Sequence, residues 1–131
     1  MAVRENYSRK RNAIYQAICS TKSHPNAEWV YEQLKPQFRD LSLGTVYRNL
    51  KKFCEDGKAI SVGVINGQEH FDADTTPHSH FVCDRCQSIS DIYKPFFSEE
   101  LLKSLNEEYG VSVTSNEVLF HGVCKECLER E

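Results

Sequence analysis

Four of the six cysteines of this chain form two Cys-x-x-Cys pairs, Cys83/Cys86 and Cys124/Cys127. Four thiolates can close one tetrahedral metal site, and such a site requires the two pairs to meet in the fold. Before and between the pairs lie Asp72, His78, His80 and Asp91. Their nitrogen and oxygen donors suit a different metal ion. The sequence shows no nucleophile motif, so the two donor sets predict a metal-dependent switch and not a hydrolase.

Length and composition favour a small cytoplasmic protein. A chain of 131 residues, 40% of them hydrophobic, can form one ordinary domain or two small ones with a modest core. We expect a cytoplasmic location, because no apolar run approaches a membrane span and no signal peptide opens the sequence. Thiols stay reduced there, which favours metal binding over disulfides. Cys19 and Cys54 stand alone and are expected to be small buried residues.

The net charge of −3 hides an asymmetry. Residues 1–58 carry 11 Lys and Arg against 6 Asp and Glu, a net of +5, and residues 59–131 carry 5 against 13, a net of −8. This distribution predicts that the first half binds a polyanion and the second does not.

Hydrophobic periodicity predicts three helices in the first half. The first spans residues 9–20 and has the basic run Arg9–Arg11 at its start. The second starts near Pro25 and ends at Pro36. His24 precedes a proline, so we expect it in an extended loop. Residues 41–53 form the third helix.

The third helix is followed by a hairpin. Val46, Leu50 and Phe53 recur at helical spacing and are expected to face inward. Asn66-Gly67 between two short strands predicts a two-residue turn. Three helices and a hairpin are the elements of a winged helix-turn-helix, whose third helix reads the major groove.

The outer face of that third helix carries hydroxyls, cations and an aromatic ring. Such groups can bind phosphates, read guanine edges or contact a thymine methyl group. The candidate DNA-binding residues are Ser42, Thr45, Tyr47, Arg48, Lys51 and Lys52, together with Arg9 and Arg11. A plain amphipathic surface helix is the alternative, but it gives no reason for an exposed tyrosine beside an arginine.

In the second half, residues 78–83 are expected to form a strand that returns at 89–93 through the first Cys-x-x-Cys. His78 and His80 then share one face, while Cys83 points to the other. A simple antiparallel hairpin pairs residue 78 with residue 91, which places Asp91 opposite His78.

Two further elements complete the second half. Ser98 caps a helix over residues 98–109, and Leu101, Leu102 and Leu105 are expected to pack inward. Residues 111–123 are expected to form a long strand that delivers the second Cys-x-x-Cys.

These motifs, in this order, resemble the ferric uptake regulator (Fur) superfamily of bacterial metalloregulators. The likeness covers nearly the whole chain after residue 8. The matching stretches are His24-Pro25-Asn26-Ala27-Glu28, Ser42-Leu43-Gly44-Thr45-Val46-Tyr47-Arg48-Asn49-Leu50, Asp72, His78-Ser79-His80, Cys83 with Cys86, and Gly122-Val123-Cys124-Lys125-Glu126-Cys127.

The resemblance implies an α+β chain. It has an N-terminal winged helix-turn-helix DNA-binding domain in residues 1–72, a hinge at 73–77, and a C-terminal α/β dimerisation and metal-binding domain in 78–131. It also implies a homodimer, a structural Zn²⁺ and a regulatory Fe²⁺ or Mn²⁺. The zinc ligands would be Cys83, Cys86, Cys124 and Cys127. The regulatory ligands would be His24, Asp72, His78, His80 and Asp91.

Both regulatory carboxylates are Asp, which favours the peroxide-responsive (PerR) branch. The expected function is a metal-dependent transcriptional repressor, not an enzyme, which binds double-stranded operator DNA. Hydrogen peroxide would act through metal-catalysed oxidation of His24 or His78. An ion bound by both halves would join them, and loss of a ligand would let them open.

Three features depart from that branch. The usual helix before residue 9 is expected to be missing. Arg48 after Tyr47 is more like the iron-sensing branch, and Asn116 stands where many iron sensors place a histidine. His70 and His121 are unassigned and are expected to be packing residues.

Four alternatives remain. The first is an iron- or zinc-sensing repressor of the same fold without peroxide chemistry. A metalloenzyme, either a thiol oxidoreductase or a non-haem iron enzyme, is disfavoured by the basic helix. A redox-active pair of Cys-x-x-Cys motifs is disfavoured against a closed metal site. A zinc-stabilised adaptor would leave the helix at 42–52 unexplained.

Overall fold

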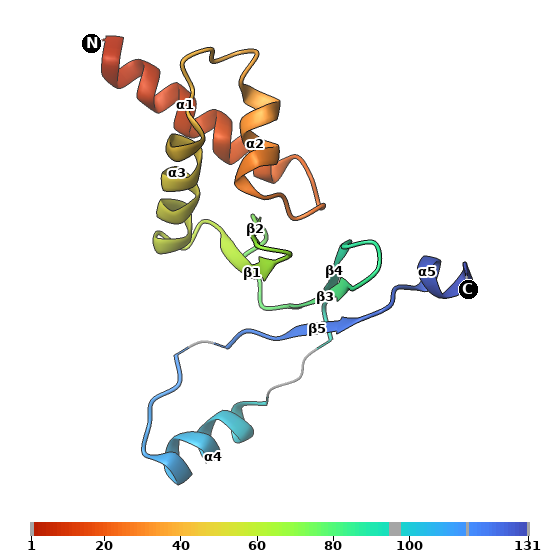
Figure 1. The fold of residues 1–131 in the computed structure, drawn as a ribbon. Coiled ribbons are helices and arrows are strands. Elements are labelled where there is room, and N and C mark those ends of the chain that lie inside the picture. The colour runs from red at the N-terminus through yellow and green to blue at the C-terminus, as the bar shows by residue number, and fades with distance from the viewer. Residues whose placement is uncertain (1, 95–97, 115, 131) are drawn as a thin grey trace. The chain divides into compact units, whose positions relative to one another are not determined.

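The structure is a computed structural model that describes residues 2–94, 98–114 and 116–130, with side chains from Tyr7 onward. The chain divides into two compact units, Met1–Thr76 (unit 1) and Pro77–Glu131 (unit 2). Within the described residues, unit 1 contains helices α1–α3 and the strands β1 and β2. Unit 2 contains β3, β4, α4, β5 and α5 (Figure 1). None of the helices described is long and apolar enough to cross a membrane.

Helix α1 (Ala2–Cys19) begins well before residue 9. Residues 2–8 contain no Gly or Pro, so nothing stops the helix from extending over them. The helix expected over residues 9–20 therefore begins seven residues earlier, and the basic run lies in mid-helix, not at the start. Lys10 Nζ lies 2.9 Å from an Asp40 carboxylate oxygen, and the Arg9 guanidinium lies over the Phe38 ring.

Helix α2 (Ala27–Leu34) starts two residues later than Pro25, because Asn26 caps it by accepting a hydrogen bond from the Trp29 N–H at 2.8 Å. The prediction of an extended His24 is wrong. Its φ is +58°, in the left-handed region, and the residue is buried. Contacts to β2, described below, override the local preference of a residue before proline.

Helix α3 (Leu43–Glu55) begins after the N-cap Ser42 and buries Val46, Leu50 and Phe53, as predicted. Strands β1 (Ile60–Ile65) and β2 (Gln68–Asp72) pair antiparallel. Asn66 and Gly67 between them have φ values of +54° and +81°, which fits the predicted turn, since it needs positive φ at both positions. The core of unit 1 consists of Ile14, Ile18, Val30, Leu34, Phe38, Leu41, Val46, Leu50, Phe53, Ala59 and Phe71.

Unit 2 contains a sheet of strand order β4-β3-β5. Strand β3 (Ser79–Cys83) pairs antiparallel with β4 (Ile89–Ile92) and parallel with β5 (Leu119–Gly122). The predicted register is wrong by two residues, because Asp91 pairs with His80 and not with His78. The turn through the cysteine knuckle occupies four residues, Asp84 to Gln87, instead of two. A shift of two leaves every side chain on its predicted face.

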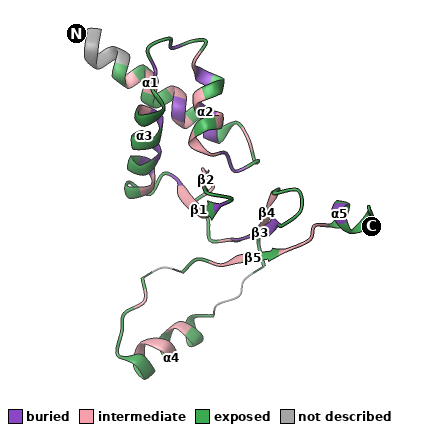
Figure 2. Ribbon diagram, viewed as in Figure 1, coloured by how far each residue is buried: buried purple, intermediate pink, exposed green. Residues whose placement is uncertain are grey.

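The remaining elements of unit 2 are shorter or more exposed than predicted. Strand β5 covers four residues, whereas a strand over 111–123 was expected; residue 115 lies outside the described residues. Helix α4 (Glu99–Tyr109) has the predicted Ser98 cap and ends at Gly110, which is in the left-handed conformation, but none of its residues is buried (Figure 2). Leu102 and Leu105 are half-buried and Leu101 is exposed. Helix α5 (Lys125–Glu129) ends the described chain.

We predict that Phe71→Ala lowers the free energy of unfolding of unit 1 by about 3–5 kcal/mol, because it leaves a cavity in a closed core. Val64→Ala on the neighbouring strand is the control. Val64 is 69% exposed, so we expect a change within about 0.5 kcal/mol. Urea unfolding is followed through Trp29, the single tryptophan, which packs against this core. Equal midpoints for the two variants would contradict the proposed core.

Candidate metal centres

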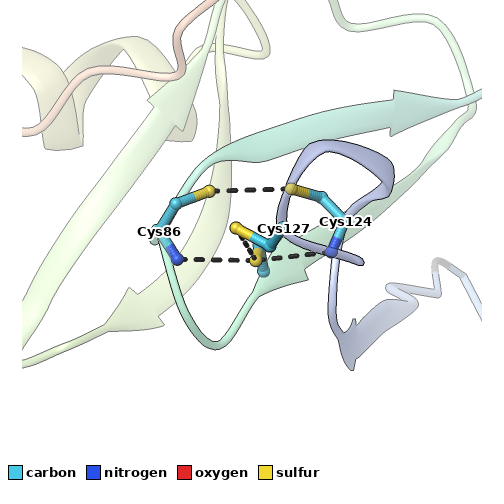
Figure 3. Close-up of side chains that lie close together, drawn as sticks. Cys86, Cys124 and Cys127 are labelled. Atoms are coloured by element: carbon cyan, nitrogen blue, oxygen red, sulfur yellow. Dashed lines mark hydrogen bonds between the residues drawn. The ribbon is translucent and has the colours of Figure 1, made fainter. Parts of the chain in front are cut away.

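The four paired cysteines meet within unit 2. Cys83 ends β3, Cys86 follows in the knuckle, Cys124 caps α5 and Cys127 lies within α5. Their sulfur atoms all lie within 4.8 Å of one another. The Sγ–Sγ distances are 3.8 Å for Cys83–Cys127 and 3.8 Å for Cys86–Cys124. Figure 3 shows the side chains of Cys86, Cys124 and Cys127 close together. The parallel pairing of β5 with β3 explains this meeting, since it brings the end of β5 beside the knuckle.

This cluster fits Zn²⁺. Four thiolates at about 2.3 Å from one ion, in tetrahedral geometry, are separated by about 3.8 Å. A closed set of four protein ligands leaves no position for a substrate, so the chemistry of the site is structural.

The cysteine thiols of this cluster differ in their pKa values. Backbone N–H groups of Cys86 and Cys124 donate to Cys83 Sγ and lower the pKa of Cys83 to about 6. The neighbouring Cys124 thiol, together with burial, raises the pKa of Cys127 to about 12. Four thiolates at this spacing repel one another, and a bound dication removes that cost.

Unit 2 also gathers His78, His80 and Asp91. Asp91 Oδ1 lies 3.1 Å from His78 Nε2 and 3.3 Å from His80 Nε2. The two imidazole rings lie on the same side of the chain, as predicted, with centroids 4.4 Å apart; His78 immediately precedes β3. The Tyr93 ring stacks on His78 at 5.0 Å. Two His and one carboxylate are the ligand set of many non-haem Fe(II) sites.

Unit 1 holds the other two predicted ligands, His24 and Asp72. His24 Nε2 lies 3.2 Å from Asp72 Oδ2, and both side chains are largely buried. The other oxygen of Asp72 accepts a hydrogen bond from the Asp74 N–H at 2.9 Å, which fixes the carboxylate. The five predicted regulatory ligands thus divide into two half-sites, one in each unit.

Both half-sites have the spacing of donors that share one ion. Two donors bound at about 2.1 Å and about 90° apart are separated by about 3.0 Å. The N–O distances of 3.1 to 3.3 Å match that value. Imidazole and carboxylate donors together suit Fe(II) or Mn(II).

The predicted DNA-binding face of α3 is exposed but has internal partners. Ser42 caps the helix and contacts Thr45, and Arg48 donates to Thr45 Oγ1 at 3.2 Å. Lys52 lies near two acidic side chains of its own helix end. In the part of the chain that the structure describes, Arg48 makes no ion pair with a carboxylate.

Glu69 of β2 was missed by the sequence reasoning. Its carboxylate accepts hydrogen bonds from Tyr47 Oη at 3.0 Å, Lys51 Nζ at 3.2 Å and Ser61 Oγ at 2.6 Å. Partial burial acts to raise the pKa of Glu69, but these hydrogen bonds outweigh it and the pKa lies below its usual value. The hydrogen bond from Lys51 in turn raises the pKa of Lys51. No sequence spacing pointed to this contact.

Other residues differ from their predicted surroundings. Cys19 is exposed and not buried, and Cys54 is partly buried. Burial is the main cause of the raised pKa of Cys54. His121 lies beside the knuckle as expected, with Nδ1 3.7 Å from an Asp84 carboxylate oxygen, but its side chain is exposed and not packed. His70 has a specific contact, described below. Asn116 is exposed.

Fold and sites together define a two-unit protein with a tetrathiolate site and a His/Asp donor set. The profile of the ferric uptake regulator family matches residues 4–121. The peroxide-responsive repressor PerR of Staphylococcus epidermidis is 33% identical over 122 residues, which cover 92% of this chain and 79% of that protein.

Two solved structures are similar over almost the whole chain. The Campylobacter jejuni peroxide stress regulator matches with a TM-score of 0.71 and 26% identity, covering 92% of this chain and 90% of that one. The Francisella tularensis ferric uptake regulator, determined with iron, matches with a TM-score of 0.70 and 26% identity, covering 93% and 92%. The chain belongs to the ferric uptake regulator family.

We predict one EDTA-resistant zinc per chain in the wild-type protein and its loss in Cys83→Ser, because three thiolates cannot close the site. We also expect Cys83→Ser to unfold unit 2 or abolish dimers. Cys19→Ser, at an exposed cysteine of α1, is the control and should keep its zinc. Elemental mass spectrometry measures the zinc content, and size-exclusion chromatography measures the oligomeric state. A stable Cys83→Ser dimer with a full zinc content would contradict the assignment.

Proposed function

We propose that this protein is a metal-dependent transcriptional repressor, not an enzyme, which binds operator DNA as a homodimer and responds to hydrogen peroxide. The observation that carries the proposal is the pair of half-sites, each with imidazole nitrogen and carboxylate oxygen at ligand spacing. Membership of the ferric uptake regulator family and the likeness to PerR support it.

The proposed organisation follows the two compact units. Residues 1–72 form a winged helix-turn-helix domain, residues 73–77 a hinge, and residues 78–131 a dimerisation and metal-binding domain. The order of three helices and a hairpin supports the first assignment. The half-buried and exposed leucines of α4 support the third, because a second copy of the chain can cover them.

His24, Asp72, His78, His80 and Asp91 are proposed to hold one Fe²⁺ or Mn²⁺. Ligands from both units on one ion favour the arrangement in which the units are joined. The size of that effect equals the difference in metal affinity between the joined and the open chain. Moving from mostly open to mostly joined needs about 5.5 kcal/mol, which several charged and imidazole ligands can supply. In the joined dimer, two copies of α3 would enter major grooves about one helical turn apart.

The DNA-binding face of this proposal is the outer side of α3, with Arg9 and Arg11 of α1 as neighbours. Tyr47 and Lys51 already interact with the Glu69 carboxylate, and acidic residues lie near Lys52. Arg48 is therefore the cation of this helix that is most available to a base edge or a phosphate.

We predict that Arg48→Ala weakens binding to an operator duplex selected from a random pool by about 1–3 kcal/mol and, where Arg48 contacts a phosphate, lowers the salt slope by about one. Lys103→Ala, an exposed residue of α4 in unit 2, should bind as the wild type does. Fluorescence anisotropy over a range of salt concentrations measures both. Unchanged binding by Arg48→Ala would remove α3 from the proposed interface.

The peroxide response is proposed to depend on His24 and His78. A bound Fe²⁺ would be held beside these imidazoles and would supply the redox chemistry by which hydrogen peroxide oxidises a ligand: one peroxide oxygen would add to the imidazole ring and the other would leave as water. Both imidazoles are almost fully shielded from solvent, so each is exposed to an oxidant formed at the site and protected from one formed in bulk water. An imidazole that gains an oxygen atom binds metal more weakly. The units then separate and the DNA is released.

We predict that hydrogen peroxide adds one oxygen atom to His24 or His78 of the Fe(II)-loaded protein and leaves the Mn(II)-loaded protein unmodified. Peptide mass mapping measures the modification, and the peptide with exposed His121 serves as an internal control. A protein that leaves DNA after peroxide treatment without any modified histidine would contradict this mechanism.

An iron- or zinc-sensing repressor of the same fold is the second candidate. Arg48 after Tyr47 favours it, because this pair is more like the iron-sensing branch. Titrating DNA binding with Fe(II), Mn(II) and Zn(II), before and after peroxide, separates the two. Release that follows metal removal but never peroxide supports the second candidate.

A further inference from the structure

The loop that carries His24 lies against strand β2. His70 Nδ1 donates a hydrogen bond to the His24 carbonyl oxygen at 2.7 Å, and the Phe71 N–H donates to the Pro25 carbonyl oxygen at 2.9 Å. The Asn26 side-chain amide donates to Gln68 Oε1, and Asn26 forms an antiparallel bridge with His70. Residues 24–26 thus run beside β2 almost as an additional strand.

His24 needs such support. Its φ of +58° is unfavourable for a residue with a side chain, and burial of its imidazole gives it no freedom to relax toward solvent. The hydrogen bond from His70 is made directly to the peptide group of His24. It restrains the rotation that would carry the imidazole away from Asp72.

Strand geometry places the supporting residue and the ligand together. Side chains alternate along a strand, so His70 and Asp72 project from one face of β2 while Glu69 and Phe71 project from the other. His24 Nε2 lies 3.2 Å from Asp72 Oδ2 on that same side. One strand therefore supplies a carboxylate ligand and also holds the backbone of an imidazole ligand.

We propose that His70 is a positioning residue, which binds no metal itself and holds His24 in the conformation required by the regulatory ion through the hydrogen bond to the His24 carbonyl. This inference rests on the proposed function, in which His24 and Asp72 are metal ligands. A partner that orients a metal ligand commonly changes metal affinity about 10- to 100-fold when it is removed.

The test compares two substitutions of His70 in the full-length zinc-loaded protein. The side-chain N–H₂ of Asn occupies nearly the place of imidazole Nδ1, so His70→Asn keeps the donor. His70→Leu has similar bulk and no donor. We expect His70→Leu to raise the Kd for Mn(II) at least tenfold and His70→Asn to stay within about threefold of the wild type. Electron paramagnetic resonance of free Mn(II) measures each Kd.

Controls separate positioning from folding. His121→Leu, at an exposed histidine of unit 2, should bind Mn(II) as the wild type does. Urea unfolding through Trp29 and the zinc content should be alike for His70→Leu and His70→Asn. If His70→Leu fails to fold, His70→Gln replaces it, because its amide nitrogen lies one bond farther out and misses the His24 carbonyl.

Each outcome decides the proposal. Equal Mn(II) affinity for the wild type and the donor-free variant overturns it. Equal weakening by His70→Asn and His70→Leu also overturns it, because the donor would then be irrelevant. Asp72→Asn distinguishes this from failure of the proposed function. If Asp72→Asn leaves Mn(II) binding unchanged, the regulatory site itself is wrong and the His70 proposal falls with it.

Discussion

The four cysteine thiols come together at the end of β3, and this cluster holds in place the strand beside which the imidazoles of unit 2 lie. Cys83 ends β3, and the knuckle that follows sets how β4 returns beside it. Because the turn takes four residues, Asp91 comes opposite His80 and stays within 3.1 Å of His78. The hard His/Asp donor set of unit 2 thus depends on the soft thiolate set at the other end of the same strand.

Most elements of the fold followed from local signals in the sequence. The Ser42 and Ser98 caps, the Asn66-Gly67 turn and the inward face of α3 all have short-range causes, and the structure contains them. The errors have longer-range causes. The number of residues in the knuckle and the left-handed His24 depend on contacts between distant segments. Neither hydrophobic periodicity nor propensity carries that information.

The residues of the candidate sites also differ in whether a local sequence pattern could predict them. The cysteine cluster could be predicted because two Cys-x-x-Cys pairs in one chain have few other uses where thiols are expected to stay reduced. The pairing of His24 with Asp72 followed from the family resemblance and not from any spacing. Glu69 and His70 escaped prediction because a single acidic or imidazole side chain on a strand has no signature until its partners are known.

Strand β2 links the two activities proposed for unit 1. Glu69 on one face restrains Tyr47 and Lys51 of α3, and His70 and Asp72 on the other face contact the His24 loop. Phe71 between them is fully buried in the core. A core packed at high density transmits a shift of this strand instead of absorbing it. Strand β2 is therefore in contact with both the His24 loop and the Tyr47 and Lys51 side chains of α3, which is a short physical route between the proposed metal ligands and the proposed DNA-reading helix.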